Sequence, residues 1–258
     1  MAERSEYTPG TPSWVDLQSP DVDASTSFYG TLFGWTANPM PDPEARGYAM
    51  FQLAGKNVAG VGPQMNPGPP AWATYVSVAN ADDTVAKVKE AGGTVFMEPM
   101  DVFDAGRMAV FADPQGAALA IWQPMARQGA DLVNEPGTFA WNELATRDID
   151  GAKVFYDKVF GWEGQTHEMG PMVYTEWKVD GQSIGGMMEM GPQYPPHVPP
   201  HWLVYFAVDD CDATVAETQE LGGSVAMPAM DIPQGRFSVL MDPQGAVFAV
   251  IQMAAAAS

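Results

Sequence analysis

The stretch Trp14-Val-Asp-Leu-Gln-Ser-Pro-Asp-Val-Asp-Ala-Ser-Thr-Ser-Phe-Tyr-Gly-Thr-Leu-Phe-Gly-Trp35 recurs 127 residues later in the same chain (141 − 14 = 127), between Trp141 and Trp162. Nine of the 22 aligned positions are identical, among them the tryptophan at each end, a Phe-Tyr pair and the closing Phe-Gly-Trp. A constant offset over such a length indicates a duplicated folding unit.

The repeat continues beyond this stretch with few insertions. Trp72-Ala-Thr-Tyr75 matches Trp202-Leu-Val-Tyr205 at an offset of 130, and Asp113-Pro-Gln-Gly116 matches Asp242-Pro-Gln-Gly245 at an offset of 129. We therefore expect a first domain, a linker and a second domain, at residues 1–126, 127–136 and 137–258.

Each copy itself contains two rounds of a strand, a helix and further strands. In the first round, Asp21 or Asp23 can cap a helix that Gly34 ends. In the second round, Asp82 or Asp83 can cap a helix that a Gly-Gly pair ends, and the Asp-Pro-Gln-Gly turn joins the last two strands. The whole chain is thus predicted to hold four units of this kind.

The composition excludes several classes of function. With 32 acidic and 12 basic residues, the formal charge of −20 repels nucleic acid and anionic membranes. No apolar run approaches the roughly 18 residues that a membrane span needs, and the first residues lack the apolar core of a signal peptide. The lone Cys211 excludes an intrachain disulfide. We expect a cytoplasmic protein, a monomer or weak homodimer, whose partner is a small molecule.

Three features together resemble the vicinal oxygen chelate superfamily: the Phe-Gly-Trp that closes the helix, the Gly92-Gly93 stop and the Asp-Pro-Gln-Gly turn. This superfamily includes glyoxalase I, extradiol dioxygenases, fosfomycin-resistance enzymes and bleomycin-resistance proteins. The stretches Arg4–Tyr7, Trp14–Gln18 and Ile184–Gly186 are also similar to a tandem type, the mycobacterial glyoxalase-like antigens of about this length. The resemblance implies an α+β fold with two tandem glyoxalase/bleomycin-resistance-like domains. Their four βαβββ modules would curl the sheets into cups.

The resemblance also implies where a divalent metal would bind. In the superfamily, up to four side chains on the concave face hold the ion, usually His or Gln from the first strand of a module and Glu from the last. Here those positions fall on Trp14, Ala73, Trp141, Leu203, Ala120 and Ala249, and near Gly60 and Gly186. Metal sites need converging nitrogen, oxygen or sulfur donors, which these side chains lack. We therefore expect neither a metal nor another cofactor.

Strand periodicity separates the concave face from the face that packs against helices. Trp202, Val204 and Phe206 form a uniformly apolar set that belongs to the core, so the alternate residues should line the cup. The candidate ligand-binding residues on that face are Trp14, Gln18, Tyr75, Trp122, Trp141, His201, Leu203 and Tyr205. Flat aromatic walls with space above small alanines suit a planar, largely apolar molecule. Alternatively, the aromatic side chains simply fill the cups.

Asp16 and Glu143 are the candidate catalytic residues. They occupy equivalent positions on an otherwise mostly apolar face, where a carboxyl group has a raised pKa and can act as a general acid or base. The alternative is a structural salt bridge or hydrogen bond, with Arg107 and Arg236 as possible partners.

These patterns favour three classes of function. The first is a metal-independent protein that binds a small apolar molecule, such as a natural product or an antibiotic. The second is a metal-free enzyme, a lyase, an isomerase or a hydroxylase-associated protein, that uses Asp16 or Glu143 as acid or base. The third is a protein with vestigial cups that acts through its surface. Metal-dependent glyoxalase or dioxygenase chemistry would require ligands elsewhere in the chain.

Overall fold

The first half of the chain forms one eight-stranded sheet in the computed structural model, which describes residues 3–65, 68–169, 172–192 and 194–254. Its strands are β1 (Pro12–Ser19), β2 (Thr36–Pro39), β3 (Ala49–Leu53), β4 (Lys56–Pro63), β5 (Ala71–Ser77), β6 (Thr94–Val102), β7 (Gly106–Ala112) and β8 (Ala118–Pro124). Their order in the sheet is β2-β3-β4-β1-β5-β8-β7-β6. The helices of this half are α1 (Val22–Phe33), the 3-10 turn η1 (Pro43–Ala45) and α2 (Ala81–Glu90).

The second half repeats this plan. Its elements are β9 (Phe139–Thr146), α3 (Ile149–Phe160), β10 (Glu163–Met169), β11 (Met172–Val179), β12 (Gln182–Glu189), β13 (His201–Ala207), α4 (Cys211–Glu220), β14 (Ser224–Ile232), β15 (Gly235–Met241) and β16 (Val247–Met253). The sheet order, β10-β11-β12-β9-β13-β16-β15-β14, is the same as in the first half. The predicted fold of four βαβββ modules in two tandem domains is confirmed.

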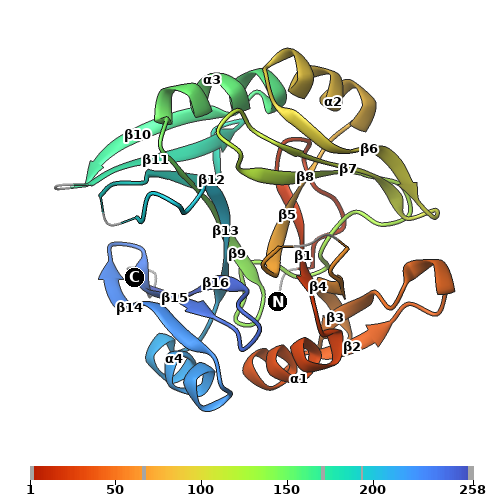
Figure 1. Cartoon of the computed structure of the whole chain (residues 1–258), viewed down its shortest axis with the longest axis vertical. Coiled ribbons are helices and arrows are strands. Elements are labelled where there is room, and N and C mark those ends of the chain that lie inside the picture. The colour runs from red at the N-terminus through yellow and green to blue at the C-terminus, as the bar shows by residue number, and fades with distance from the viewer. Residues whose placement is uncertain (1–2, 66–67, 170–171, 193, 255–258) are drawn as a thin grey trace.

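In each sheet, two modules meet along a central antiparallel pair, β1 with β5 and β9 with β13. Within a module, the first strand runs parallel to the last, as β1 does to β4 and β5 does to β8. Figure 1 shows the two sheets curling away from each other, with one helix outside each module. None of the helices in the described ranges is long and apolar enough to cross a membrane.

Local sequence signals set the helix ends. The Asp21 side chain accepts a hydrogen bond from the backbone N–H of Ala24 at 3.0 Å, and Gly34 ends α1 in the left-handed region with φ of 70°. The prediction that Asp82 or Asp83 caps α2 was wrong. Asn80 is the cap. The two aspartates lie in the first turn of α2, where their negative charges interact favourably with the positive end of the helix dipole.

The short outer strands β2 and β10 complete the three strands that follow the helix in the predicted βαβββ plan, but their residues were not recognised as strands in the sequence. They follow directly on the Phe-Gly-Trp motif and pair with β3 and β11 at the sheet edges. In β2, three of the four residues are exposed, so the strand lacks the apolar alternation by which a strand is recognised.

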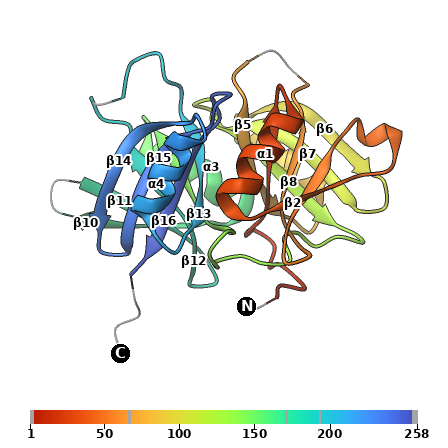
Figure 2. The same ribbon diagram turned by 90° about the horizontal axis from the view of Figure 1, so that it is seen from below.

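The two domains share their helix-side cores. One core joins side chains from α1, β1 and β4 to others from β13, β15, β16 and α4. A second core joins the modules of α2 and α3. Figure 2 shows α1 and α4 side by side across the domain boundary. The duplicated modules therefore bury their apolar faces against each other.

Reciprocal hydrogen bonds explain why the repeated motifs recur. The hydroxyl of Tyr29 donates to Asp242 of the other domain at 3.0 Å, and that of Tyr156 donates to Asp113 at 3.1 Å. Both pairs are buried, and each joins the Phe-Tyr motif of one copy to the Asp-Pro-Gln-Gly turn of the other.

The Phe-Gly-Trp motif crosses the boundary in the same way. Trp35 Nε1 donates to the carbonyl of Gly137 at 2.7 Å, and Trp162 Nε1 donates to the carbonyl of Gly10 at 2.7 Å. The residues that revealed the repeat are thus the ones that hold the two copies together, in a pseudo-twofold arrangement.

Candidate functional site

The concave face of the first sheet, which we call the first cup, follows from the pairing register. Asp16 of β1 lies opposite Gly60 of β4 and Ala73 of β5, and Trp14 lies opposite Tyr75. Directly paired residues project to the same side of a sheet. The structure thus places the predicted residues Trp14, Asp16 and Tyr75 on one surface.

A hydrogen-bonded network surrounds Asp16, which is only 4% exposed. The Tyr75 hydroxyl donates to Oδ2 of Asp16 at 2.9 Å, and the Tyr48 hydroxyl donates to the same oxygen at 3.3 Å. Trp14 Nε1 donates in turn to the Tyr48 hydroxyl at 3.1 Å. The other carboxylate oxygen, Oδ1, is buried and has no hydrogen-bond partner among the described residues.

This environment changes the acidity of Asp16. Burial raises its pKa to about 6, and the hydrogen bonds from Tyr75 and Tyr48 counteract part of that rise. A carboxyl group of this kind can hold or release a proton close to neutral pH, as general acids and bases do.

The second cup, the concave face of the second sheet, repeats the network around Glu143. The Tyr205 hydroxyl donates to Oε1 of Glu143 at 2.9 Å, and Trp141 Nε1 donates to the Tyr174 hydroxyl at 2.9 Å. Burial raises the pKa of Glu143, while the hydroxyls of Tyr174 and Tyr205 lower it. A Trp-Tyr-carboxylate-Tyr arrangement therefore occurs in both cups.

Tyr48 and Tyr174 are the site residues that our reading of the sequence missed. Each reaches the carboxylate across a glycine of the neighbouring strand, Gly60 or Gly186, where an added Cβ would collide with the tyrosine hydroxyl. The signal was present, because both glycines lie near the implied metal-ligand position and both tyrosines precede them at the same distance (60 − 48 = 186 − 174 = 12). This spacing can be interpreted only once the folded hairpin is known to place each tyrosine over the glycine.

Trp122 lies on the same face of the first cup, away from Asp16. It pairs with Ser77 and with Met108, and the ladder continues from Met108 to Met100 on the outer strand β6. Met100 is 47% exposed. This side of the first cup is therefore an accessible wall of tryptophan and methionine.

The remaining predicted residues lie farther along the strands. Gln18 is half-buried, two residues beyond Asp16 on β1. Leu203 lies directly opposite Glu143, and His201 lies opposite Ala145. The Nδ1 atom of His201 is 2.9 Å from the Pro199 carbonyl oxygen, so this side chain lies at the start of its strand.

A longer connection carries additional side chains over the second cup. The residues between β12 and β13 outnumber those between β4 and β5 by four, because the offset of the repeat changes from 126 at Gly60 and Gly186 to 130 at Trp72 and Trp202. In this connection, the Tyr194 hydroxyl is 3.8 Å from Met188 Sδ, and its ring packs near His201.

Tyr194 also lies close to the carboxylate of the second cup. Burial raises the pKa of Tyr194, and the charge of Glu143 raises it further. Arg147 fixes the connection by donating from Nη2 to the carbonyls of Pro195 and Val198, at 3.2 and 3.0 Å. The second cup is thus partly filled by the chain itself.

The residues of the cups do not fit the metal that the superfamily resemblance implies. Within the described ranges, no group of three or more His, Cys, Asp or Glu side chains could hold an ion. Asp16 and Glu143 instead accept hydrogen bonds from tyrosine hydroxyls. One carboxylate that already accepts hydrogen bonds from tyrosines does not supply the several converging donors that a metal site requires.

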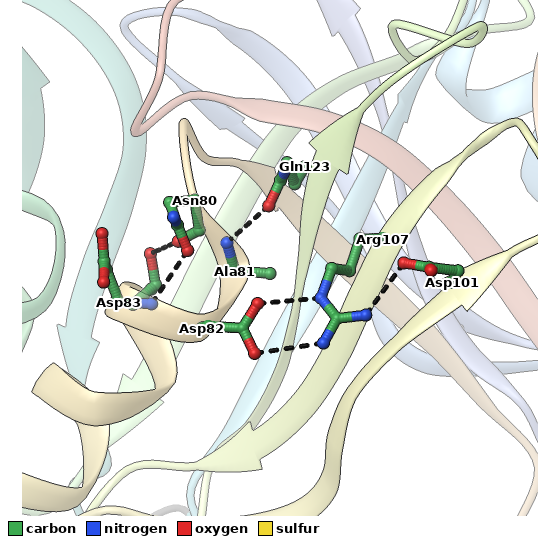
Figure 3. A network of polar contacts seen from close by, with 8 residues as sticks. Asn80, Ala81, Asp82, Asp83, Asp101, Arg107 and Gln123 are labelled. Carbon is green, nitrogen blue, oxygen red and sulfur yellow. Dashed lines mark hydrogen bonds and ion pairs between the residues drawn. The ribbon is translucent and has the colours of Figure 1, made fainter.

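Arg107 and Arg236 do not pair with the buried carboxylates, so the salt-bridge form of our alternative interpretation is wrong, whereas Asp16 and Glu143 do form hydrogen bonds to neighbouring strands, through tyrosine hydroxyls. Arg107 binds Asp82 at 2.9 Å and Asp101 at 2.8 Å, as Figure 3 shows. Arg236 binds Asp212 and Asp231 in the same way. These arginines connect each second helix to its sheet at the surface.

The comparisons with known proteins agree with this architecture. The family described as "Glyoxalase/Bleomycin resistance protein/Dioxygenase superfamily" matches residues 11–121 and 122–250. The Mycobacterium bovis protein "Putative glyoxylase CFP32" is 47% identical and covers 98% of this chain and 99% of its own length. "Anthracycline biosynthesis protein DnrV" of Streptomyces peucetius is 42% identical and covers 96% of this chain and 95% of its own length.

Solved structures resemble the chain in fold. The Mn(II)-bound glyoxalase from Novosphingobium aromaticivorans has a TM-score of 0.65 at 18% identity, over 95% of this chain and 82% of its own. The 2,3-dioxygenase LapB from Pseudomonas sp. KL28 has a TM-score of 0.66 at 13% identity, over 96% and 94%.

Proposed function

The chain belongs to the glyoxalase/bleomycin resistance protein/dioxygenase superfamily, and we propose that it is a metal-independent member that binds a small, largely apolar aromatic molecule in its first cup. The observation that carries this proposal is the buried Trp-Tyr-carboxylate-Tyr network, whose carboxylate residue Asp16 pairs with Gly60 and Ala73, two of the positions at or near which the superfamily resemblance implies metal ligands. It leaves an aromatic wall and a single carboxyl group for recognition.

The side chains of the first cup suit such a ligand. Trp14 and Trp122 are half-buried and offer flat apolar surfaces with polar edges. Met108 and Met100 are flexible and polarisable, so they can adapt to a bound ring system. The Oδ1 atom of Asp16 is buried and has no hydrogen-bond partner among the described residues, so a ligand hydroxyl that displaced a neighbouring side chain and reached it would remove the cost of this unpaired atom.

The relatives support an aromatic natural product as the ligand class. The two Streptomyces relatives, DauV and DnrV, are named for anthracycline biosynthesis. Anthracyclines are planar polycyclic molecules with hydroxyl groups, which is the chemistry that the first cup suits.

The first cup is the better candidate because two side chains close to its carboxylate are smaller than their counterparts in the second cup. Gly62 and Ala73 stand where the second cup has Met188 and Leu203. Tyr194 of the second cup occupies further space there, beside Met188.

Titration of tryptophan fluorescence with an anthracycline aglycone tests the proposal. We expect saturable binding with one molecule per chain. Trp122→Ala should weaken it by about 1–3 kcal/mol, because an aromatic contact is lost. Ile251→Ala, the matched change in the second cup, should leave it unaltered. Equal loss in both variants, or elemental analysis showing one Zn, Ni, Fe or Mn per chain after dialysis, would contradict the proposal.

A metal-free enzyme is the second candidate, and the acidity of Asp16 favours it. With a pKa of about 6, this carboxyl group can exchange a proton with a bound molecule near neutral pH. Asp16→Asn separates the two candidates. In a binding protein, the affinity for a neutral ligand should stay within a few-fold. In an enzyme, turnover should disappear while binding persists.

A further inference from the structure

A polar cavity of about 440 Å³ lies beside the first cup, where the N-terminal arm meets the segment that follows β8. Its lining includes two arginines, Arg4 and Arg127, together with Ser5 and Gln128. Asp104 and Asp131 also line it, so the formal charge of the lining is zero. The distribution of these charges therefore decides what the cavity can bind.

Arg127 is held at the edge of the first cup by its backbone. Its carbonyl accepts a hydrogen bond from Trp122 Nε1 at 2.9 Å, and its N–H donates to the Ala105 carbonyl at 3.0 Å. The side chain also acts on the cup electrostatically. Burial and the Asp16 charge raise the pKa of the Tyr48 hydroxyl, and the Arg127 charge counteracts this rise.

Arg4 lines the same cavity from the N-terminal arm. Its N–H donates to the Asp131 carbonyl at 2.8 Å, and Glu3 next to it forms an ion pair with Lys56 at 2.8 Å. The Tyr7 hydroxyl donates to the Ala130 carbonyl at 2.7 Å, which attaches the arm a second time.

The guanidinium groups of Arg4 and Arg127 are uncommitted. In the described part of the chain, neither has an ion pair or a side-chain hydrogen bond, whereas Arg107 and Arg236 each bind two aspartates. By contrast, the Asp131 carboxylate already accepts two hydrogen bonds from Asn57, at 2.7 and 3.0 Å. Asp104 is exposed, as are Arg4 and Arg127, so water screens the charges of all three side chains.

We infer that Arg127, assisted by Arg4, forms an anion-binding subsite at the edge of the first cup, and that the ligand of this cup is an aromatic acid. This inference rests on the proposed function and names the class of its ligand. The ring system would lie against Trp122 and the methionine wall, while its carboxylate or sulfonate group contacts the guanidinium of Arg127. Arginine suits this role because its planar group can donate two parallel hydrogen bonds to such an anion.

The sequence repeat does not duplicate Arg127 in the second half of the chain. The position that corresponds to Arg127 at an offset of 129 is Ala256 in the sequence. Because the whole chain carries a formal charge of −20, an organic anion is repelled unless a local cation attracts it. A preference of the first cup for an anionic ligand would therefore depend on Arg127 and Arg4.

Two fluorescent probes with the same ring system test the inference: anilinonaphthalene sulfonate, an anion, and phenylnaphthylamine, its neutral counterpart. We expect the full chain to bind both. Arg127→Gln should weaken binding of the sulfonate roughly tenfold, the scale of a lost charge-assisted hydrogen bond, and leave the amine within twofold. Arg4→Gln should show the same selectivity with a smaller loss.

Lys158→Gln is the matched control, because it removes one exposed positive charge from the last turn of α3, on a helix face. It should leave both probes unaffected. If Arg127→Gln changes neither probe, or if Lys158→Gln weakens the sulfonate equally, the subsite is wrong while the proposed function stands. If neither probe binds the native chain, the proposed function fails together with the subsite.

Discussion

The two halves of the molecule share the same helix-side core, which we call the frame, and differ in the side chains on their concave faces. On the helix side, both halves have the same buried pair of a tryptophan and a tyrosine. Trp72 Nε1 donates a hydrogen bond to the Tyr29 hydroxyl, and Trp202 Nε1 donates one to the Tyr156 hydroxyl, each at 3.0 Å. On the concave side, the first cup has Asp16, whose buried Oδ1 has no hydrogen-bond partner within the described ranges, whereas the second has Glu143 close to Tyr194.

This contrast separates two physical constraints. Helix-side residues of one copy bind the other copy, so a change there disturbs both halves of the molecule. The hydrogen bonds of the concave residues named above stay within their own half of the chain, so each cup can change its side chains independently. We therefore expect the two cups to differ in ligand selectivity. Equivalent residues on the helix sides of the two halves should contribute equally to stability.

The largest effect should come from the shared frame. Trp72→Ala and Trp202→Ala should each destabilise the protein by about 3–5 kcal/mol, because both leave a core cavity and a tyrosine hydroxyl without its donor. Urea unfolding measures this, with Leu203→Ala, next to Trp202 but facing the cup, as a milder control. Costs that differ strongly between the two tryptophan variants would break the equivalence of the helix-side cores.

The second effect concerns the first cup and its carboxyl group. The pKa of Asp16 is about 6 in the folded chain, against an ordinary value of 3.8. Because the folded state binds the proton more tightly than the unfolded state, Asp16 contributes to the free energy of unfolding, and this contribution is fully present below about pH 4. It is lost as the pH rises through about 6, at a cost of about 3 kcal/mol.

Asp16→Asn should remove this pH dependence. The variant should gain stability over the native chain from pH 4 to pH 8, by up to about 3 kcal/mol, as measured by urea unfolding at each pH. Glu143→Gln should change stability in the same direction, because burial also raises the pKa of Glu143. Parallel profiles for Asp16→Asn and the native chain would show that Asp16 is ionised without cost.

The sequence predicted the frame better than the cups. Period-two patterning placed Trp202 on the helix side and Tyr205 on the concave side, because a strand with one buried face has a fixed alternation. The roles of Tyr48 and Tyr174 could not be predicted, since they depend on how closely a hairpin approaches a glycine on the next strand. Arg107 was misassigned because sequence position does not reveal which acidic residue an exposed arginine reaches.

The third effect separates the cups by ligand binding. Trp14→Ala should weaken binding of an aromatic ligand by about 1–3 kcal/mol, because a wall of the first cup is lost. Trp141→Ala, the equivalent change in the second cup, should alter the affinity by less than about 0.5 kcal/mol. Calorimetric titration of both variants measures the difference. A greater loss in Trp141→Ala would assign the ligand to the second cup.

The smallest effect should come from Tyr194, the residue that fills the second cup. Its ring is only half-buried, so Tyr194→Ala should destabilise the chain by about 1 kcal/mol or less. The substitution should open space beside Met188 and Glu143, and a second, weaker equivalent of phenylnaphthylamine should then bind. Tyr194→Phe keeps the ring and loses only a weak contact to sulfur, so it should bind one equivalent like the native chain. If Tyr194→Ala also binds one equivalent, the side chains of Met188 and Leu203 are sufficient to close the cup. The difference between the two halves would then lie in the strands themselves rather than in the longer connection.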